Sequence, residues 1–370
     1  MDRKEDSLHD LMGVLHKVYD HGIKVEKINI YDTEKVVEVP TCDVTYRIHV
    51  IPSLSEKPPP SDELPDLRSK PDEDPFAEPF APAEFLTDLD EGYHSLLNKF
   101  CFLPEQFVLV SHRWAVQADP LEVEDLWAAW RVLKAMEKAG RRGFVFVNVG
   151  KLSGASQPHR HIQPPAQPHV LPLPYVHFFT PLPGTSKHHQ PAPSTSTATS
   201  SSTPSLSSST SSSSSSSPSS LSTPSDPTTT PSQEITPATL QEIYETHLGQ
   251  FESHGAQPES EGVRSHNVLL TLRGLHTIPR KSRDVEVPVP AHLKNLLIKK
   301  AEEEKEKKQK EEGKDDDEDD EEIEIEDKLK FSINGLGFVG YFFMKPGCDR
   351  LLKEFGLDNV LKRVGYERKE

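Results

Sequence analysis

The sequence predicts an α+β fold, a largely antiparallel sheet flanked by helices, and three observations support it. Short apolar runs rich in β-branched and aromatic residues are typical of strands. At least one amphipathic stretch carries helix start and stop signals. Long polar tracts interrupt these segments and offer little apolar surface for a core. The mixture favours a folded α+β part with disordered insertions.

A helix is predicted over residues 119–140, DPLEVEDLWAAWRVLKAMEKAG. Asp119 is the expected N-cap, and Pro120 takes the first helical position. Glu122 completes a capping box, and Gly140 ends the helix. The apolar side chains recur at helical spacing, so they are expected to face the core.

Further elements are expected on both sides of this helix. QFVLVSH at 106–112 and GFVFVNV at 143–149 are predicted strands that pack under it. Further strands are predicted within HNVLLTLRGLHTIPR at 266–280 and INGLGFVGYFFMK at 333–345. A second helix is predicted within TPATLQEIYETHLGQFESH at 236–254.

Composition indicates that much of the chain does not pack. The 370 residues include 33 prolines, only 34% are hydrophobic, and the net charge is −17. Residues 186–232 are nearly all Ser, Thr and Pro, which indicates a flexible linker. Residues 302–328 hold 17 acidic and 6 basic side chains, so this tract supplies most of the negative charge. It is expected to be a solvated insertion or a fraying charged helix, with a docking tail for a basic partner as the alternative.

These composition shifts divide the chain into three parts. Residues 1–182 form an N-terminal part, which contains the sequence HxHxQ. Residues 183–234 form a disordered Ser/Thr/Pro-rich linker. Residues 235–370 form a C-terminal part, with a disordered acidic insertion expected at about 300–328.

Three widely spaced cysteines and the absence of a CxxC pair argue against both a disulfide framework and a cysteine-based zinc site. The charged N-terminal stretch does not resemble a signal peptide, and no apolar run is long enough to span a membrane. The expected location is therefore the cytoplasm, with the nucleus as a further possibility. Neither a nucleic acid nor a membrane is expected as a partner.

The stretch SGASQPHRHIQ, residues 153–163, has an unusual alternation. In an extended strand Gln157, His159, His161 and Gln163 would project from one face, because side chains alternate between faces. Four polar groups there indicate a surface that handles a polar molecule. The preceding turn contains Gly154, which permits close approach of a phosphate to the backbone.

The segment VNVGKLSGASQPHRHIQ resembles the active-site segment of the histidine-triad superfamily, in the branch where glutamine replaces the last histidine. Within that branch the chain resembles galactose-1-phosphate uridylyltransferases and, more closely, the fungal diadenosine tetraphosphate phosphorylases, which are ATP adenylyltransferases. PSLSEKP at 52–58, LLNKF at 96–100, SHNVLLT at 265–271 and NGLGFVGYFFMK at 334–345 resemble further blocks of that family, in the same order. The resemblance implies a histidine-triad-like fold.

The resemblance also implies a reaction. His161 would attack the α-phosphorus of diadenosine tetraphosphate, expel ATP and hold AMP until inorganic phosphate takes it as ADP. Gln163 would donate a hydrogen bond to a nonbridging oxygen without activating water. His159 is expected either to orient its neighbour or to act as a second functional histidine, and orientation is favoured.

The implied ligands are dinucleoside polyphosphates, ATP, ADP and phosphate, bound by a monomer. A divalent cation, Mg²⁺, is expected with the nucleotide, whereas neither a metal site on the protein nor tightly bound zinc is expected. The residues implied in substrate binding match the family's motifs position by position. They are Lys57, Asn98, Lys99, Asn148, Gly154, Ala155, Ser156, Gln157, Gln163, Thr271, Tyr341 and Lys345.

Two alternatives remain at this level. The first is a nucleotidyltransferase similar to the hexose-1-phosphate uridylyltransferases. The second is a noncatalytic nucleotide-binding scaffold, whose acidic and Ser-rich segments would carry the biological role.

Overall fold

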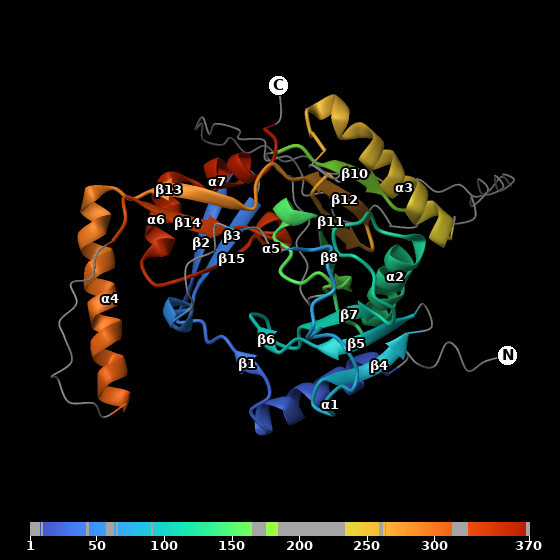
Figure 1. Cartoon of the computed structure of the whole chain (residues 1–370), viewed down its shortest axis with the longest axis horizontal. Coiled ribbons are helices and arrows are strands. Elements are labelled where there is room, and N and C mark those ends of the chain that lie inside the picture. The colour runs from blue at the N-terminus through green and yellow to red at the C-terminus, as the bar shows by residue number, and fades with distance from the viewer. Residues whose placement is uncertain are drawn as a thin grey trace, which may run out of the picture. The chain divides into compact units, whose positions relative to one another are not determined.

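The computed structural model describes residues 8, 10–41, 44–56, 63, 66–89, 92–164, 175–183, 234–258, 262, 264–312 and 325–367. Met1–Leu182 and Ile235–Glu370 form one compact unit (Figure 1). Of the other unit, Pro183–Glu234, only the first and last residues are described, so the predicted Ser/Thr/Pro-rich linker lies outside the described residues. No helix within the described part is long and apolar enough to cross a membrane.

Two four-stranded antiparallel sheets form the centre of the compact unit. They adjoin where β8 and β9 meet, through a bridge between Phe146 and Gln163. The first sheet has the order β4 (Phe85–Leu89), β5 (Tyr93–Leu97), β7 (Phe107–Ser111) and β9 (His161–Ile162). The second has the order β10 (Phe178–Pro181), β12 (Gly274–Pro279), β11 (His266–Thr271) and β8 (Val145–Val149).

Smaller sheets lie beside this centre. Parallel pairing joins β15 to β3, and antiparallel pairing joins β3 to β2. Their bounds are β2 (Lys35–Thr41), β3 (Val44–Val50) and β15 (Tyr341–Met344). Two-stranded sheets are formed by β1 (Asn29–Ile30) with β6 (Phe100–Cys101), and by β13 (Asp284–Pro288) with β14 (Lys328–Ser332).

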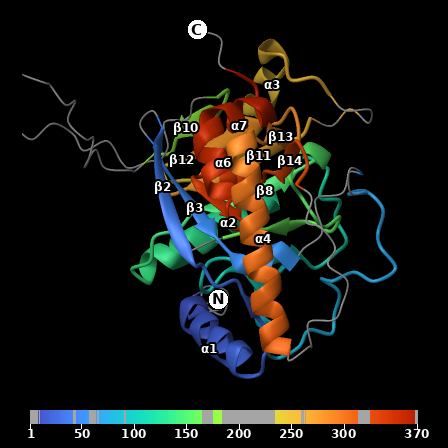
Figure 2. The same cartoon turned by 90° about the vertical axis from the view of Figure 1, so that its left-hand side faces the viewer.

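The helices divide between two hydrophobic cores. Side chains of α1 (Leu11–Lys24), α2 (Val123–Lys138) and α3 (Pro237–Gln250) pack with strands of both central sheets. The second core receives the start of α4 (Ala291–Glu312), together with α5 (Gly335–Phe338), α6 (Cys348–Phe355) and α7 (Leu357–Val364). Figure 2 shows α4 running past the elements of this core. The predicted α+β class with largely antiparallel sheets is confirmed.

The predicted helix 119–140 is present, but its expected start is wrong. Helix α2 begins at Val123, with Glu122 as N-cap and Asp125 completing the capping box. The segment before it stays outside the helix, because the guanidinium of Arg160 donates hydrogen bonds to the carbonyl oxygens of Asp119, at 2.8 Å, and Pro120, at 3.3 Å. Those carbonyl oxygens therefore accept hydrogen bonds from a side chain and not from the amides of a first helical turn.

Two other expectations need correction. Within 333–345 only Tyr341–Met344 is a strand, and residues 335–338 form a helical turn because the Asn334 side chain accepts a hydrogen bond from the Leu336 amide at 3.0 Å. The acidic insertion expected at about 300–328 does not begin as a disordered segment: α4 continues to Glu312. A pair such as Lys300 with Glu303, at 2.8 Å, supports a charged helix. Residues 313–324 lie outside the described residues.

Candidate active site

The predicted alternation is present along β9. A bridge joins Val116 to His159 before the strand, and a second joins Phe146 to Gln163 after it. Ile162 belongs to the hydrophobic core under α2, so the side chains of alternate residues face the opposite side of the sheet. His161 is paired with Val110 in this sheet and contacts the Phe76 ring at a centroid distance of 5.4 Å.

The ring of His161 has a defined tautomer. Its Nδ1 lies 2.9 Å from the carbonyl oxygen of His159, and because a carbonyl can only accept, Nδ1 carries the proton. Burial lowers the pKa of His161 to about 4, with a smaller contribution from the neighbouring charges of His159 and Arg160. The imidazole is therefore neutral at pH 7, and the lone pair lies on Nε2. A neutral imidazole with an available lone pair is a competent nucleophile.

His159 is held by partners on both ring nitrogens. Nδ1 lies 2.8 Å from a carboxylate oxygen of Asp74, and Nε2 lies 2.9 Å from the Ser111 carbonyl oxygen. The Trp114 ring packs beside it at a centroid distance of 5.1 Å. With its side chain fixed, His159 presents its carbonyl to His161. This geometry fits the orienting role that sequence analysis favoured.

Between the two histidines, Arg160 points to the opposite face, where it forms a buried ion pair with Asp125 of α2. Both side chains are 3% exposed. Asp125 also accepts hydrogen bonds from the Tyr93 hydroxyl and from the Glu122 amide, the latter at 2.7 Å. This network anchors the backbone of the HxHxQ segment to the first turn of α2.

We expect Asp125→Ala to cost about 3–5 kcal/mol of unfolding free energy, because it leaves the Arg160 charge buried without its carboxylate. The matched control is Glu137→Ala, which removes the partner of Lys134 in an exposed pair and should cost less than about 1 kcal/mol. Urea unfolding of both variants measures the difference. Equal losses would contradict the anchoring role of the buried pair.

Gln117 fixes the main chain of the central histidine. It is fully buried, and its Oε1 accepts a hydrogen bond from the His161 amide at 2.8 Å. Its Nε2 donates to the Asn148 carbonyl oxygen on β8 at 2.6 Å. One side chain therefore connects β9 to β8 beside the point where the two central sheets adjoin.

The glycine-containing turn between β8 and β9 has the backbone that glycine permits. Gly150 and Gly154 have φ of 84° and 85°, on either side of a short 3-10 helix at Lys151–Ser153. A Cβ atom on Gly154 would lie 2.7 Å from Asn334 Cα and 2.9 Å from the Ile333 carbonyl oxygen. The C-terminal NGLG segment thus packs directly on the turn, and only glycine fits there.

A buried network of hydrogen bonds includes the main chain of this turn. The Asn148 carboxamide oxygen accepts hydrogen bonds from Asn267, at 2.7 Å, and from the Gly335 amide, at 3.0 Å. Arg280 donates to the Ser153 carbonyl oxygen at 2.9 Å and to the Asn267 carboxamide oxygen at 2.7 Å. Burial lowers the pKa of Arg280 to about 9, so its positive charge is retained beneath the turn at pH 7. A positive charge next to the turn favours binding of an anion at the turn.

We expect Gly154→Ala to destabilise the protein by about 2–5 kcal/mol, because backbone strain adds to a steric conflict with the main chain. Gly140→Ala is the matched control: its φ is +71° and a Cβ would meet nothing within 4 Å, so it should cost about 1–2 kcal/mol. Thermal unfolding of the two variants measures both losses. Equal losses of stability in the two variants would show that the steric conflict with the NGLG segment does not contribute to the cost of Gly154→Ala.

The other residues implied at the turn differ in exposure. Ala155 is buried, packing with Leu67 and Ala118. Ser156 is exposed, and Gln157 and Gln163 are half-buried. The structure thus brings Asn148, the turn and the polar face of β9 together.

The remaining residues implied in substrate binding, apart from Lys57, lie on other described segments. Asn98 accepts a hydrogen bond from the Phe100 amide of β6, and Thr271 accepts one from the Arg273 amide of the turn after β11. Lys99 pairs with Glu84 at 3.1 Å. Tyr341 lies on β15 and Lys345 follows that strand, in the sheet with β2 and β3. Lys57 lies outside the described residues.

A surface hollow of about 480 Å³ contains none of the residues of this site. His161 itself is 4% exposed. Phe76, in the Pro- and acid-rich loop before β4, packs against its ring. Phe76 of this loop is therefore one of the side chains that bury the imidazole.

This fold and site define an α+β protein whose HxHxQ segment lies where two antiparallel sheets adjoin. A family model described as Ap4A phosphorylase N-terminal domain matches residues 3–183, and one described as ATP adenylyltransferase C-terminal domain matches residues 172–367, more than half of the chain. The chain belongs to the ATP adenylyltransferase family.

Two curated relatives come from Saccharomyces cerevisiae. The chain is 32% identical to Protein APA1 over 159 residues, which is 42% of this chain, and 33% identical to diadenosine 5',5'''-P1,P4-tetraphosphate phosphorylase 2 over 159 residues, which is 40% of it. The chain spans 48% of the length of each of these relatives.

The fold is also similar to crystal structures of yeast Ap4A phosphorylase Apa2. The structure in complex with AMP superposes with a TM-score of 0.61 at 19% identity, covering 98% of both chains. The structure in complex with Ap4A has a TM-score of 0.61 at 20% identity and covers 98% of this chain and 99% of that one.

Proposed function

We propose that the protein transfers an adenylyl group from diadenosine tetraphosphate to inorganic phosphate, producing ATP and ADP. The observation that carries the proposal is the hydrogen bond from His161 Nδ1 to the His159 carbonyl oxygen. Together with the lowered pKa, it leaves the nucleophilic lone pair on Nε2 at neutral pH. The names of the family models and of the yeast relatives support the same substrate.

The reaction proceeds in two displacements. Nε2 of His161 forms a bond to the α-phosphorus while the bond from that phosphorus to the bridging oxygen breaks, and ATP leaves. A phosphate oxygen then attacks the same phosphorus, the P–N bond breaks, and ADP leaves. Returning the lone pair to Nε2 restores the starting enzyme, so ping-pong kinetics are expected.

The proposed roles of the other groups follow from their chemistry. Gln163, on the same face as the imidazole, donates an amide hydrogen bond to a nonbridging oxygen of the transferred group. A carboxamide does not remove a proton from water, so transfer to phosphate is favoured over hydrolysis. The positive charge of Arg280 beneath the glycine turn favours a bound phosphate group there.

We also propose that the loop before β4 moves when substrate binds. His161 is 4% exposed and the Phe76 ring packs against it, so a displacement of Phe76 would open the imidazole to a phosphate group. Asp74 of the same loop binds His159, so loop position and histidine orientation are coupled.

The remaining binding assignments are part of the proposal. Lys57, Asn98, Lys99, Thr271, Tyr341 and Lys345 keep the substrate-binding roles implied by the family motifs. Mg²⁺ is proposed to accompany the nucleotide, held by phosphate oxygens. A cytoplasmic location is proposed because the 370 residues include only three cysteines, too few and too widely spaced for a disulfide framework.

The test is an incubation of the full chain with diadenosine tetraphosphate, Mg²⁺ and ³²P-labelled phosphate, with the products separated by ion-exchange chromatography. The proposal predicts equal amounts of ADP and ATP, with the label in the β-phosphate of ADP and none in ATP. AMP and ATP formed without phosphate would show hydrolysis instead. Either that result or the absence of turnover would overturn the proposed reaction.

A further inference from the structure

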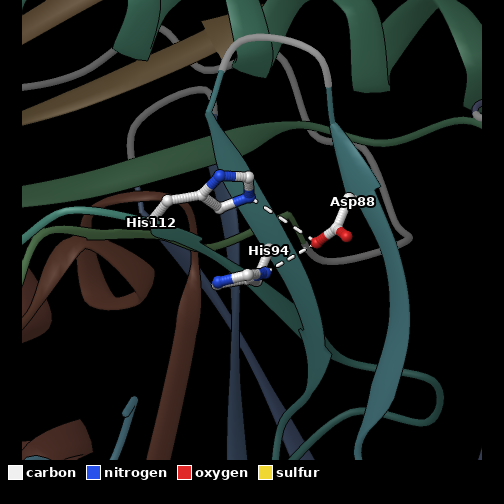
Figure 3. A group of neighbouring side chains, drawn as sticks. All are labelled: Asp88, His94 and His112. Atoms are coloured by element: carbon white, nitrogen blue, oxygen red, sulfur yellow. Dashed lines mark hydrogen bonds and ion pairs between the residues drawn. The ribbon is translucent and has the colours of Figure 1, made fainter. Parts of the chain in front are cut away.

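A cluster outside the proposed active site brings two histidines and a carboxylate together on three adjacent strands. Asp88 of β4 is paired directly with His94 of β5. His112 follows β7, and its amide donates to the Gly92 carbonyl oxygen at 2.8 Å, which places it diagonally across from His94. Paired and diagonal neighbours on antiparallel strands share one face of the sheet. Figure 3 shows both imidazole rings directed at the Asp88 carboxylate.

The potential ligand atoms are already close to metal-binding spacing. Oδ1 of Asp88 lies 2.6 Å from Nδ1 of His94 and 3.6 Å from Nε2 of His112, and one ligand atom from each residue lies within 4.8 Å of the others. Tetrahedral zinc binds nitrogen and oxygen at about 2.0–2.2 Å, which separates neighbouring ligand atoms by roughly 3.4 Å. Small rotations of exposed side chains are enough to reach that arrangement.

The surroundings of His94 are those of a fixed metal ligand. Its Nε2, on the other side of the ring, lies 3.6 Å from a carboxylate oxygen of Glu78. Metal-binding histidines commonly direct their second ring nitrogen at a carboxylate, which fixes the tautomer. The Phe80 ring packs edge-on against the imidazole at a centroid distance of 4.8 Å. Only 11% of the His94 side chain is exposed, so its position is constrained.

The other two ligands leave a path for an ion. The side chains of Asp88 and His112 are 59% and 37% exposed. The His112 ring and the Asp88 carboxylate can therefore adjust to an entering cation, and the exposed side of the cluster leaves room for a water molecule. Three protein ligands and one water complete a four-coordinate zinc site.

We propose that Asp88, His94 and His112 bind one zinc ion, with water as the fourth ligand. Imidazole nitrogens suit zinc, whereas Mg²⁺ prefers an all-oxygen shell, so this site is separate from the cation expected with the nucleotide. The proposal revises the expectation that zinc is not tightly bound. That expectation considered only cysteine-containing sites, and sequence spacing gives no indication that these three residues meet.

The position suggests a role in holding the sheet together. His94 is paired with Val110, and Val110 is paired with His161, so the cluster faces the same side of the sheet as the imidazole. Because two strand spacings separate β5 from β9, the cluster lies about 10 Å from His161. An ion in the cluster is therefore too far away to bind the phosphate group that His161 attacks. An ion there ties the edge strand β4 to β5 and to the end of β7.

The test uses the full chain stripped of metal by a chelator and then titrated calorimetrically with Zn²⁺ or Mg²⁺ alone. We expect one equivalent of Zn²⁺ to bind in the micromolar range or tighter and to raise the unfolding temperature, and Mg²⁺ to do neither. Co²⁺ should give the visible absorption of a four-coordinate ion. Asp88→Asn and His112→Ala, which alter exposed positions, should each weaken Zn²⁺ binding at least about 100-fold.

The matched control is His292→Ala, which removes an exposed histidine that also faces a carboxylate, Glu354, at 2.9 Å. It should bind Zn²⁺ as the wild type does. Unchanged Zn²⁺ affinity in both Asp88→Asn and His112→Ala would place the metal elsewhere. Either that result or the absence of Zn²⁺ binding by the wild type would overturn the proposed site, whatever the outcome of the phosphorolysis assay.

Discussion

Replacing His161 with alanine is expected to lower the rate of the proposed phosphorolysis by about 10⁴-fold or more, because the variant lacks the atom that is proposed to bond to phosphorus. No other described group in the site combines a neutral nitrogen lone pair with the required position on β9. The measurement is the initial rate of ADP formation from diadenosine tetraphosphate and phosphate.

Two controls distinguish loss of the nucleophile from loss of folding. The unfolding temperature of His161→Ala shows whether the variant still folds. His292→Ala removes a different, exposed histidine and so controls for the loss of any histidine. The control should turn over at the wild-type rate. A folded His161→Ala variant that keeps more than about a tenth of the wild-type rate would exclude His161 as the nucleophile.

Stability is expected to fall steeply in mild acid because four histidines are buried in neutral form. Burial lowers the pKa of His161, His247 and His266 to about 4 and that of His276 to about 3. In the unfolded chain each group has a pKa of about 6.5. Between about pH 6.5 and pH 4 the unfolded chain therefore binds more protons than the folded one, and stability decreases as the pH falls.

The expected loss between pH 7 and pH 5 is about 2 kcal/mol for each histidine that stays neutral when folded. The losses sum to several kcal/mol, so the urea midpoint should drop markedly across this range. Equal midpoints at pH 7 and pH 5 would contradict the neutral buried state of these histidines.

The polar face of β9 could be predicted from the sequence because its signal is local. Gln157, His159, His161 and Gln163 occupy alternate positions, and period-two alternation needs no knowledge of distant residues. The strands within 106–112 and 143–149 were predictable from a different local signal, short apolar runs rich in β-branched and aromatic residues. Family motifs then identified His161 as the central residue of this face.

The groups that hold the two histidines had no comparable signal. Asp74 binds His159 across 85 positions, and Gln117 binds the His161 main chain across 44. Asp74 lies in a Pro- and acid-rich stretch that composition describes only as a long loop. Arg280 reaches Ser153 across 127 positions. Such contacts depend on the assembled fold, which local pattern does not encode.

The incorrect start of α2 has the same cause. Capping rules place Asp119 and Pro120 at the helix start, and they consider only the residues that follow. In the structure the Arg160 side chain, directly before β9, donates hydrogen bonds to their carbonyl oxygens. A long-range charge–carbonyl contact therefore overrides a local capping signal.

The most direct test of the central claim is mass spectrometry of the intact chain after incubation with diadenosine tetraphosphate in the absence of phosphate. The account predicts a mass increase of one adenylyl group, retained at alkaline pH, mapped to the peptide containing His161 and lost when phosphate is added. An adduct on a different residue would contradict it. Equally, ADP and ATP forming with phosphate while no adduct appears without it would show that phosphate attacks the substrate directly.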